Sequence, residues 1–353
     1  MADSGRLRVA LIAPAVMPIN DETCYGGAEL VLRDLGVMLA QSGHQVTVFA
    51  PKGSKVAGCE IFTTIDCGPD KAWGRDKEAF WTWREELDGF DVVHSHEHHG
   101  YVYAAQQLKN RALPIIHTPH GLIQPQVNIP WWDNPCVVAL SEHHRKDTQE
   151  KFSYDSPVVY NGVDMAFYHR LDPTFNPNST RWLSFGLMAP HKGHLEAIYA
   201  AAAAGVGKMD VAGEDRFVSD PAYVKEVKAA CVDHGFTYHG PVDIVGKRLL
   251  FQRAMGVICW YSDLEACPVT VLEAVACGAF IHASSAGPLP ELIDPGWGNI
   301  YHNTDELTKG LTRFGHQPHD EADVVHFRYR FSANAMAREY VKLYWRVAEG
   351  KRW

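Results

Sequence analysis

Short hydrophobic runs alternate with longer amphipathic segments along the first half of the chain. Residues 8–14 (RVALIAP) are apolar after the leading arginine, which is typical of a strand buried on both faces of a parallel sheet. Residues 28–42 repeat apolar side chains at helical spacing, and this pattern stops at Gly43. The next apolar run is residues 45–50. This alternation predicts a doubly wound α/β fold.

The same alternation continues and then restarts in the second half of the chain. A polar stretch rich in proline and asparagine, residues 171–180, has the composition of a linker. Further strands are predicted at residues 91–94, 113–118, 136–140, 181–186, 208–213, 236–240, 257–261 and 279–284, and further helices at 194–204, 269–277 and 332–347. We therefore predict two Rossmann-like domains, residues 1–165 and 166–330, and a C-terminal segment, residues 331–353, whose helix packs back on the first domain.

The composition limits the classes of function that fit this chain. Its 353 residues exceed what one hydrophobic core usually holds, and its formal net charge of −9 argues against a nucleic-acid-binding surface. The eight cysteines form no CxxC pair, and several lie in apolar runs, which favours free thiols in a reducing cytoplasm. The apolar N-terminal run is too short to span a membrane and predicts no signal peptide, while a peripheral membrane contact is left open.

The segment EACPVTVLE, residues 265–273, holds two glutamates separated by seven residues. Because proline is favoured in the first turn of a helix and excluded from its interior, Pro268 predicts Glu265 in a loop and Glu273 in the second helical turn. The cysteine before the proline is a poor cap, so the N–H groups of residues 269–271 are expected to be available to an anion. Two carboxylates beside such a site suit hydroxyl groups such as a ribose diol. An ordinary surface loop and helix explain the spacing equally well.

Two glycine-containing turns precede predicted helices. Gly26 and Gly27 follow the first strand and allow a ligand to approach the backbone closely. The sequence there is not GxGxxG, and no obvious acidic partner for a nicotinamide ribose follows the second strand, so a dinucleotide site is disfavoured. Gly186 begins the other turn, and Lys192 lies between a strand and a helix, where α/β proteins bind ligands. Lys192 is placed to neutralise a diphosphate, although a tight turn and a solvated lysine explain these motifs as well.

Histidines cluster after two strands of the first half, in HSHEHH at residues 94–99 and in HTPHG at 117–121. A HxH pair after a strand resembles the metal ligands of amidohydrolase-type barrels, so a metal-dependent hydrolase that uses His94 and His96 is one alternative. That alternative requires a single eightfold barrel, which the restarted second half does not favour. We expect no metal site and one active-site histidine, His120.

Eight motifs, taken in order, resemble the landmarks of family 4 retaining glycosyltransferases. They are YGGAELVLRDLGVMLAQSGHQVTVFAP, DVVHSH, HTPHG, VALSEHHRKD, VYNGVD, FGLMAPHKGH, DVAGED and LEACPVTVLEAVACGAFIHASSAGPLPELI. The resemblance extends to the C-terminal AREYVKLYW, and the two glutamates match the EX7E signature of the family. It implies an α/β fold of GT-B type, with two facing Rossmann-like domains and a C-terminal helix that crosses back to the first.

The resemblance also implies roles for individual residues. In such enzymes the second glutamate, here Glu273, holds the nucleotide ribose, and the first, Glu265, lies against the transferring sugar. Lys192 and the backbone at Gly27 contact the donor diphosphate, and the base lies near residues 238–242. The expected catalytic residues are His120, which faces the sugar, together with Glu265 and Lys192. The expected donor-binding residues are Gly26, Gly27, Gly186, Lys192, Glu265, Pro268, Val269, Thr270 and Glu273.

Two positions depart from the family pattern. Leu187 stands where the family usually has arginine, so the diphosphate clamp is reduced to Lys192 unless Lys247 or Arg248 compensates. Pro268 lacks an N–H group, so one hydrogen bond to the sugar is absent and the identity of the sugar stays open.

We therefore predict a metal-independent retaining glycosyltransferase that requires no cofactor. It moves a sugar from a nucleotide diphosphate, UDP-linked in preference to GDP-linked, to a hydroxyl of a glycan or small-molecule acceptor, mainly by positioning and charge. Acceptor contacts are expected from loops at residues 68–83 and 122–134. A second alternative, kept open by Leu187, is a sugar-nucleotide-binding protein without catalysis.

Overall fold

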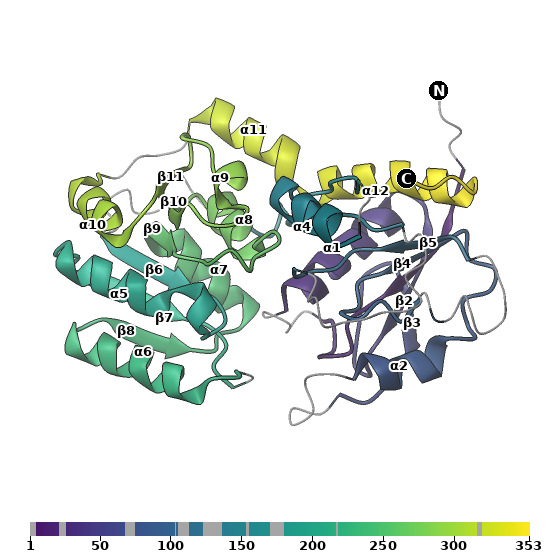
Figure 1. Ribbon diagram of the computed structural model, residues 1–353, viewed down its shortest axis with the longest axis horizontal. Coiled ribbons are helices and arrows are strands. Elements are labelled where there is room, and N and C mark those ends of the chain that lie inside the picture. Colours follow the sequence, from purple (N-terminus) through teal and green to yellow (C-terminus); the bar gives the residue numbers. More distant parts are fainter. Residues whose placement is uncertain are drawn as a thin grey trace. The chain divides into compact units, whose positions relative to one another are not determined.

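The computed structural model describes residues 5–20, 26–67, 75–102, 104, 113–122, 136–152, 155–169, 180–216, 218–315 and 320–353 (Figure 1). The chain divides into two compact units: unit 1 is Met1–Gly162 with Ala333–Trp353, and unit 2 is Val163–Ser332. Each unit holds a parallel sheet with flanking helices, so the predicted α/β class is confirmed.

Unit 1 is built on a five-stranded parallel sheet in the order β3-β2-β1-β4-β5. Its strands are β1 (Arg8–Ile12), β2 (Gln45–Ala50), β3 (Glu60–Thr63), β4 (Val92–Ser95) and β5 (Ile115–His117). Its helices are α1 (Gly27–Gln41), α2 (Asp76–Trp83), α4 (Glu142–Phe152) and α12 (Ala333–Ala348). Strands β1, β4 and β5 are buried almost throughout, which explains why their sequences are mostly apolar.

Two predictions for unit 1 were wrong. Residues 136–140 do not form a strand: Val137 and Ala139 make only isolated bridges, to His117 and Val158. The expected acceptor loop at residues 68–83 ends in α2 instead. Residues 68–74 and 123–134 lie outside the described part of the chain.

Unit 2 is built on a six-stranded parallel sheet in the order β11-β10-β9-β6-β7-β8. Its strands are β6 (Arg181–Phe185), β7 (Lys208–Ala212), β8 (Thr237–Gly240), β9 (Ala254–Cys259), β10 (Phe280–Ser284) and β11 (Gly298–Tyr301). Its helices are the short 3-10 helix η1 (Pro190–Lys192), α5 (His194–Ala203), α6 (Pro221–Asp233), α7 (Ile244–Arg253), α8 (Val269–Ala276), α9 (Leu289–Leu292), α10 (Thr304–Arg313) and α11 (Glu321–Phe331).

Local sequence signals explain where several of these helices begin. The carboxylate of Asp220 accepts hydrogen bonds from two N–H groups in the first turn of α6, and Pro221 occupies the first helical position. Asp243 caps α7 in the same way, through a 2.6 Å bond from the N–H of Gly246. These caps fix the residues at which α6 and α7 begin.

The chain passes between the two units twice, after Gly162 and after Ser332. On the unit 2 side these two passages are joined, because Val163 forms a parallel bridge with Ser332 and its N–H group donates to the carbonyl of Phe331 at 3.0 Å. Among the described helices, none combines the length and hydrophobicity that a bilayer crossing requires. The seven cysteines that the structure describes carry free thiols, and five of them are buried.

Candidate functional site

The start of α8 lies at the carboxyl end of the unit 2 sheet, and Pro268 fixes it. Pro268 is the N-cap residue, in an extended conformation, and no side chain caps the helix. Glu265 therefore lies in the preceding loop and Glu273 lies inside the helix, as the proline predicted. Of the three N–H groups expected to be available, that of Val271 donates to the carbonyl of Pro268 at 3.2 Å, which narrows the predicted anion site to Val269 and Thr270.

The first glutamate of the pair binds a lysine from the neighbouring strand connection. Lys192 Nζ lies 2.6 Å from Glu265 Oε1 and 4.7 Å from the centre of the Tyr261 ring. The two loops are also joined by their backbones, because the N–H of Ser262 donates to the carbonyl of His191 at 3.0 Å. The carboxyl ends of adjacent strands β6 and β9 thus bring a carboxylate and an ammonium group together at the point where the strand order reverses.

The second glutamate binds a different lysine, and this pair is buried. Lys247 Nζ of α7 lies 2.6 Å from both Oε1 and Oε2 of Glu273, and these residues are only 3% and 1% exposed. The hydrogen-bond geometry is satisfied only at Oε1, so Glu273 Oε2 is a buried acceptor without a hydrogen-bond partner among the described residues. The ammonium group also lies near the rings of Phe185 and Tyr168.

The turn from Gly186 to Gly193 is held in shape by a buried histidine. His194 Nε2 donates to the carbonyl of Leu187 at 3.0 Å, and His194 Nδ1 accepts from the hydroxyl of Ser184 at 2.8 Å. Since a carbonyl can only accept, the proton is on Nε2. Burial lowers the pKa of His194 to about 4, so the imidazole is neutral near pH 7.

Gly193 is a position where only glycine fits. Its φ is +61°, and a Cβ added there would lie 2.0 Å from the carbonyl oxygen of Trp260. This close approach of two backbones places Lys192 directly beside the loop that carries Glu265.

Neither residue suggested as a replacement for the missing arginine lies beside Lys192 as a second cation for a diphosphate. Lys247 binds Glu273, whereas Arg248 lies over the ring of Phe167 at 4.7 Å and its Nη1 donates to the carbonyl of Phe167 at 3.4 Å. With Leu187 in place of arginine and Lys247 bound to Glu273, Lys192 is the lysine that lies beside the start of α8.

Tyr238 and its surroundings mark the predicted base-binding region of unit 2. The hydroxyl of Tyr238 donates to Asp215 Oδ2 at 2.8 Å, and Lys228 Nζ lies 2.9 Å from the same oxygen. The hydrogen bonds from Lys228 and Tyr238 hold the pKa of Asp215 below its usual value despite burial. Asp215 follows β7, Tyr238 lies in β8 and Lys228 lies on α6, so this cluster is on the β7–β8 side of the unit 2 sheet.

In unit 1 the predicted glycine turn opens α1. Gly26 is the N-cap residue with φ +91°, and Gly27 is the first residue of the helix and is exposed. A Cβ on Gly26 would lie 2.2 Å from Glu29 Oε2, so the turn requires glycine. Glu29 itself is buried, and this raises its pKa to about 7. Tyr25 of the same motif lies outside the described residues.

His120 contacts a second histidine of unit 1. His120 Nε2 lies 2.7 Å from His96 Nδ1, and the two rings stack with their centres 5.0 Å apart. Burial lowers the pKa of His120 to about 3 and that of His96 well below its usual value, so both rings are neutral. His96 follows β4 and His120 follows β5, and the adjacent ends of these parallel strands explain why residues 24 positions apart in the sequence meet.

His94 is a buried packing residue whose two ring nitrogens both contact hydroxyl groups. Its Nδ1 lies 2.8 Å from the hydroxyl of Tyr344 on α12, and its Nε2 lies 2.8 Å from the hydroxyl of Thr118. The Tyr340 hydroxyl contacts Thr118 in turn, at 3.0 Å. No group of three or more potential metal ligands is assembled anywhere in the described ranges, and the sheet in each unit is open, so the barrel that the hydrolase alternative requires is absent from these ranges.

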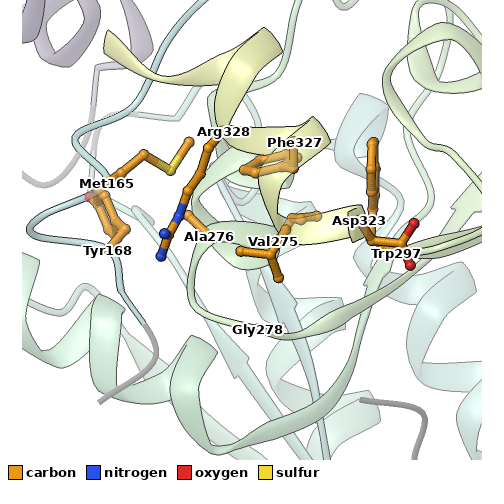
Figure 2. Close-up of a pocket in the computed structure, with 10 residues that line it drawn as sticks. Met165, Tyr168, Val275, Ala276, Gly278, Trp297, Asp323, Phe327 and Arg328 are labelled. Atoms are coloured by element: carbon orange, nitrogen blue, oxygen red, sulfur yellow. The ribbon is translucent and has the colours of Figure 1, made fainter. Parts of the chain in front are cut away.

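A cavity of about 120 Å³ in unit 2 is lined by residues of α8 and α11 together with Met165 and Tyr168 (Figure 2). Val275 and Ala276 of α8 line one wall, and Arg328 of α11 and Tyr168 line another. Because the Tyr168 ring also faces Lys247 at 5.9 Å, this cavity adjoins the packing around the buried ion pair. None of the residues expected to bind the donor lines it.

The family comparison agrees with the motifs. Residues 25–167 match the sequence model of the family described as Glycosyltransferase Family 4, which confirms the predicted resemblance. This match covers less than half of the chain, and together with the two parallel sheets it supports an α/β fold of GT-B type. No curated protein matches the chain significantly by sequence.

Solved structures with the same fold cover nearly the whole chain. AviGT4, a glycosyltransferase involved in avilamycin A biosynthesis, is 21% identical with a TM-score of 0.74, covering 98% of this chain and 99% of its own. Sucrose-phosphate synthase from Thermosynechococcus elongatus is 18% identical with a TM-score of 0.80, covering 98% of this chain and 100% of its own. HepE from Anabaena, solved with UDP and glucose, is 16% identical with a TM-score of 0.77, covering 96% and 99%.

From the sequence, Lys247 was expected only as a possible replacement for the missing arginine, and His96 was not predicted to contact His120. Both contacts join residues more than 20 positions apart, so no local spacing predicts them. The available signal was indirect: a glutamate in an otherwise apolar helix, as in VTVLEAVA, requires a cation once that helix is buried.

Proposed function

We propose that the protein transfers a sugar from a nucleotide diphosphate sugar to an acceptor hydroxyl, with retention of anomeric configuration and without a metal ion. The observation that carries this proposal is the pair of lysine–glutamate contacts on either side of the start of α8. Lys192–Glu265 and Lys247–Glu273 place two carboxylates and one partly exposed ammonium group around an uncapped helix N-terminus. Such a helix start favours phosphate, whereas the carboxylates favour sugar hydroxyls.

Glu273 is assigned to the nucleotide ribose. Lys247 Nζ lies 2.6 Å from both of its oxygens but meets hydrogen-bond geometry only at Oε1, so in the described part of unit 2 Oε2 is a buried, ion-paired acceptor without a hydrogen bond. A ribose hydroxyl that donates to Oε2 would give this atom a hydrogen bond, and Lys247 would offset the charge of the buried carboxylate.

Lys192 is assigned to the donor diphosphate. In the structure its ammonium group is bound by Glu265, and both side chains are about 15% exposed. We expect an incoming diphosphate, which carries more negative charge than one carboxylate, to take over this ammonium group and release Glu265 toward the sugar. As the glycosidic bond breaks, the leaving diphosphate gains charge, and one such preorganised contact is worth roughly 2–4 kcal/mol of barrier.

Unit 1 is assigned two contributions on the family resemblance. The exposed start of α1 at Gly26 and Gly27 supplies backbone N–H groups to the diphosphate, and His120 supplies a neutral ring to the transferred sugar. UDP is the favoured nucleotide because HepE has been solved with UDP, UDP with glucose, and UDP-glucose. The acceptor is assigned no closer than a hydroxyl of a sugar or small molecule.

Nucleotide binding is the first test. Calorimetry and thermal unfolding with UDP, GDP and ADP should show UDP raising the melting temperature most, because a ligand that binds only the folded state stabilises it. Binding by none of the three nucleotides would refute the donor assignment. NMR of the product then reports the anomer: an inverted product would refute the retaining assignment, and loss of transfer on chelation would refute metal independence.

Two substitutions test the residue assignments. Glu273→Gln should weaken nucleotide binding at least about tenfold, since it removes a charge-assisted hydrogen bond to ribose. Lys192→Met should lower kcat by roughly 10²-fold or more. Glu226→Gln and Lys225→Met, both exposed on α6, are matched controls that should leave binding and turnover unchanged. Wild-type nucleotide affinity in Glu273→Gln, or wild-type turnover in Lys192→Met, would remove that residue from the mechanism.

A further inference from the structure

The contact between His96 and His120 connects a fully buried ring to a half-buried one. His96 is 0% exposed, and its Nδ1 lies 2.7 Å from His120 Nε2. At this distance one nitrogen donates and the other accepts, because two protonated nitrogens would repel and two bare nitrogens would not attract. The contact therefore couples the proton positions of the two rings.

Packing against His94 and a backbone hydrogen bond fix the position of His96. Its ring lies 4.1 Å, centre to centre, from the ring of His94, and both nitrogens of His94 are bound to the hydroxyls of Tyr344 and Thr118. The neighbouring backbone is also fixed, because the N–H of His96 donates to the carbonyl of Ile12 on β1 at 2.8 Å. His96 is therefore unable to turn without breaking buried contacts.

The surroundings of the second nitrogen in each ring indicate which ring donates the hydrogen bond between them. His96 Nε2 is buried and finds no partner within the described ranges, whereas His120 Nδ1 is not a buried atom. If His120 Nε2 donated, His96 would carry its own proton on Nε2 as a buried N–H without an acceptor. Buried N–H groups without partners are rarer in proteins than buried acceptors without partners. The favoured arrangement has His96 Nδ1–H donating to His120 Nε2, which leaves the proton of His120 on Nδ1.

We propose that His96 is a positioning residue that holds His120 as a fixed Nδ1–H donor, so that His120 offers the transferring sugar one hydrogen-bond donor and no basic nitrogen. This inference rests on the proposed function for its substrate, a nucleotide-linked sugar, but the proton positions belong to the protein alone. The lone pair of His120 Nε2 is occupied by His96, so His120 cannot take a proton from the acceptor hydroxyl. It recognises an oxygen of the sugar instead.

The proton positions can be measured directly on the intact chain. Long-range proton–nitrogen correlation spectra of the ¹⁵N-histidine-labelled protein distinguish Nδ1–H from Nε2–H rings, and the His120→Gln variant assigns the His120 signal. We expect a neutral Nδ1–H tautomer for His120 throughout the neutral pH range, with no nucleotide present. A Nε2–H tautomer, or an imidazolium, would overturn the proposal whatever the enzyme transfers.

Two variants of His96 separate positioning from folding. His96→Leu removes the donor, and we expect kcat to fall roughly 10- to 100-fold with little change in the KM for the donor, because the sugar contact is misplaced while ribose and diphosphate contacts remain. In His96→Asn the amide can replace the Nδ1–H group, and kcat should recover most of the loss. His302→Asn, an exposed histidine, is the matched control.

The outcomes distinguish this inference from the proposed function. If His120 is the Nδ1–H tautomer but no sugar is transferred from any nucleotide, the function fails and the protonation assignment stands. If transfer occurs but His96→Leu and His96→Asn reduce kcat equally, the positioning role is refuted. If His96→Leu does not fold, the tautomer of the wild-type protein and the His96→Asn kinetics still decide the question.

Discussion

Removing one partner of the buried Lys247–Glu273 pair should destabilise the protein far more than removing both. In Lys247→Met the side chain keeps its length but loses its charge, and the carboxylate of Glu273, only 1% exposed, is left without its cation. An uncompensated buried charge of this kind costs about 3–5 kcal/mol. That is a large part of the total stability of a typical domain, about 5–15 kcal/mol.

The double variant Lys247→Met with Glu273→Gln provides the comparison. It has no buried charge, and we expect it to recover most of the loss, since a buried ion pair replaced by uncharged groups of similar volume is often close to neutral in stability. Lys225→Met, at an exposed position on α6, should change stability by no more than about 0.5 kcal/mol.

The pH dependence gives a second signature of the single variant. Without Lys247, burial should raise the pKa of Glu273 in the folded state, so the folded protein binds a proton that the unfolded chain has already released. Stability of Lys247→Met should therefore decrease as pH rises above about 4.3, the ordinary glutamate pKa, and the deficit should be smallest in acid. Wild type and the double variant should lack this additional slope.

Urea unfolding measures the global free energy, and hydrogen exchange of the α8 amides reports unit 2 separately if the two units unfold in different steps. The reasoning would be refuted if the single and double variants were equally destabilised. It would also be refuted if Lys247→Met cost less than about 1 kcal/mol at neutral pH, because the ion pair would then not be buried as the structure shows.

Three further predictions concern separate features. Burial raises the pKa of Glu29 from 4.5 to about 7, so the stability of the wild-type protein decreases as pH rises through this interval. At pH 8 Glu29→Gln should therefore be more stable than wild type, by up to about 3 kcal/mol in urea unfolding, whereas at pH 4 it should show no gain. Gly193→Ala should destabilise the protein by more than about 2 kcal/mol in thermal or urea unfolding, because φ is +61° and the new Cβ meets the Trp260 carbonyl; a neutral result would contradict that approach. Tyr344→Phe should lower the free energy of unfolding by about 1–3 kcal/mol, because His94 loses a buried hydrogen bond. Slower hydrogen exchange of the α12 amides in this variant than in wild type would contradict the prediction.

The part of the site that sequence predicted is the part that depends on local backbone chemistry. Pro268 excludes itself from a helix interior, and from this alone the loop position of Glu265 and the helical position of Glu273 followed. The doubly wound α/β class was predictable because strands buried on both faces read as apolar runs, whereas the GT-B type followed from the family resemblance of the motifs.

The contacts that complete the site were not predictable in this way. Lys247 meets Glu273 because α7 and α8 pack side by side, and His96 meets His120 because β4 and β5 are neighbours in the sheet. The strand predicted at residues 136–140 is reduced to isolated bridges because the edge strand β5 ends at His117, which pairs with Val137, while Ala139 bridges to Val158 instead. Each of these outcomes is decided by tertiary packing rather than by local preference.

The two chain passages at Gly162 and Ser332 also bear on how the protein assembles during synthesis. Unit 2 is a continuous segment inserted into unit 1, and its ends are already joined by the Val163–Ser332 bridge. It can therefore fold as soon as it leaves the ribosome, whereas unit 1, although its sheet is made first, waits for α12 to bring Tyr344 to His94. The order of completion reverses the order of translation, and a nonsense mutation near residue 333 would damage the N-terminal unit while sparing the one beside it in the sequence.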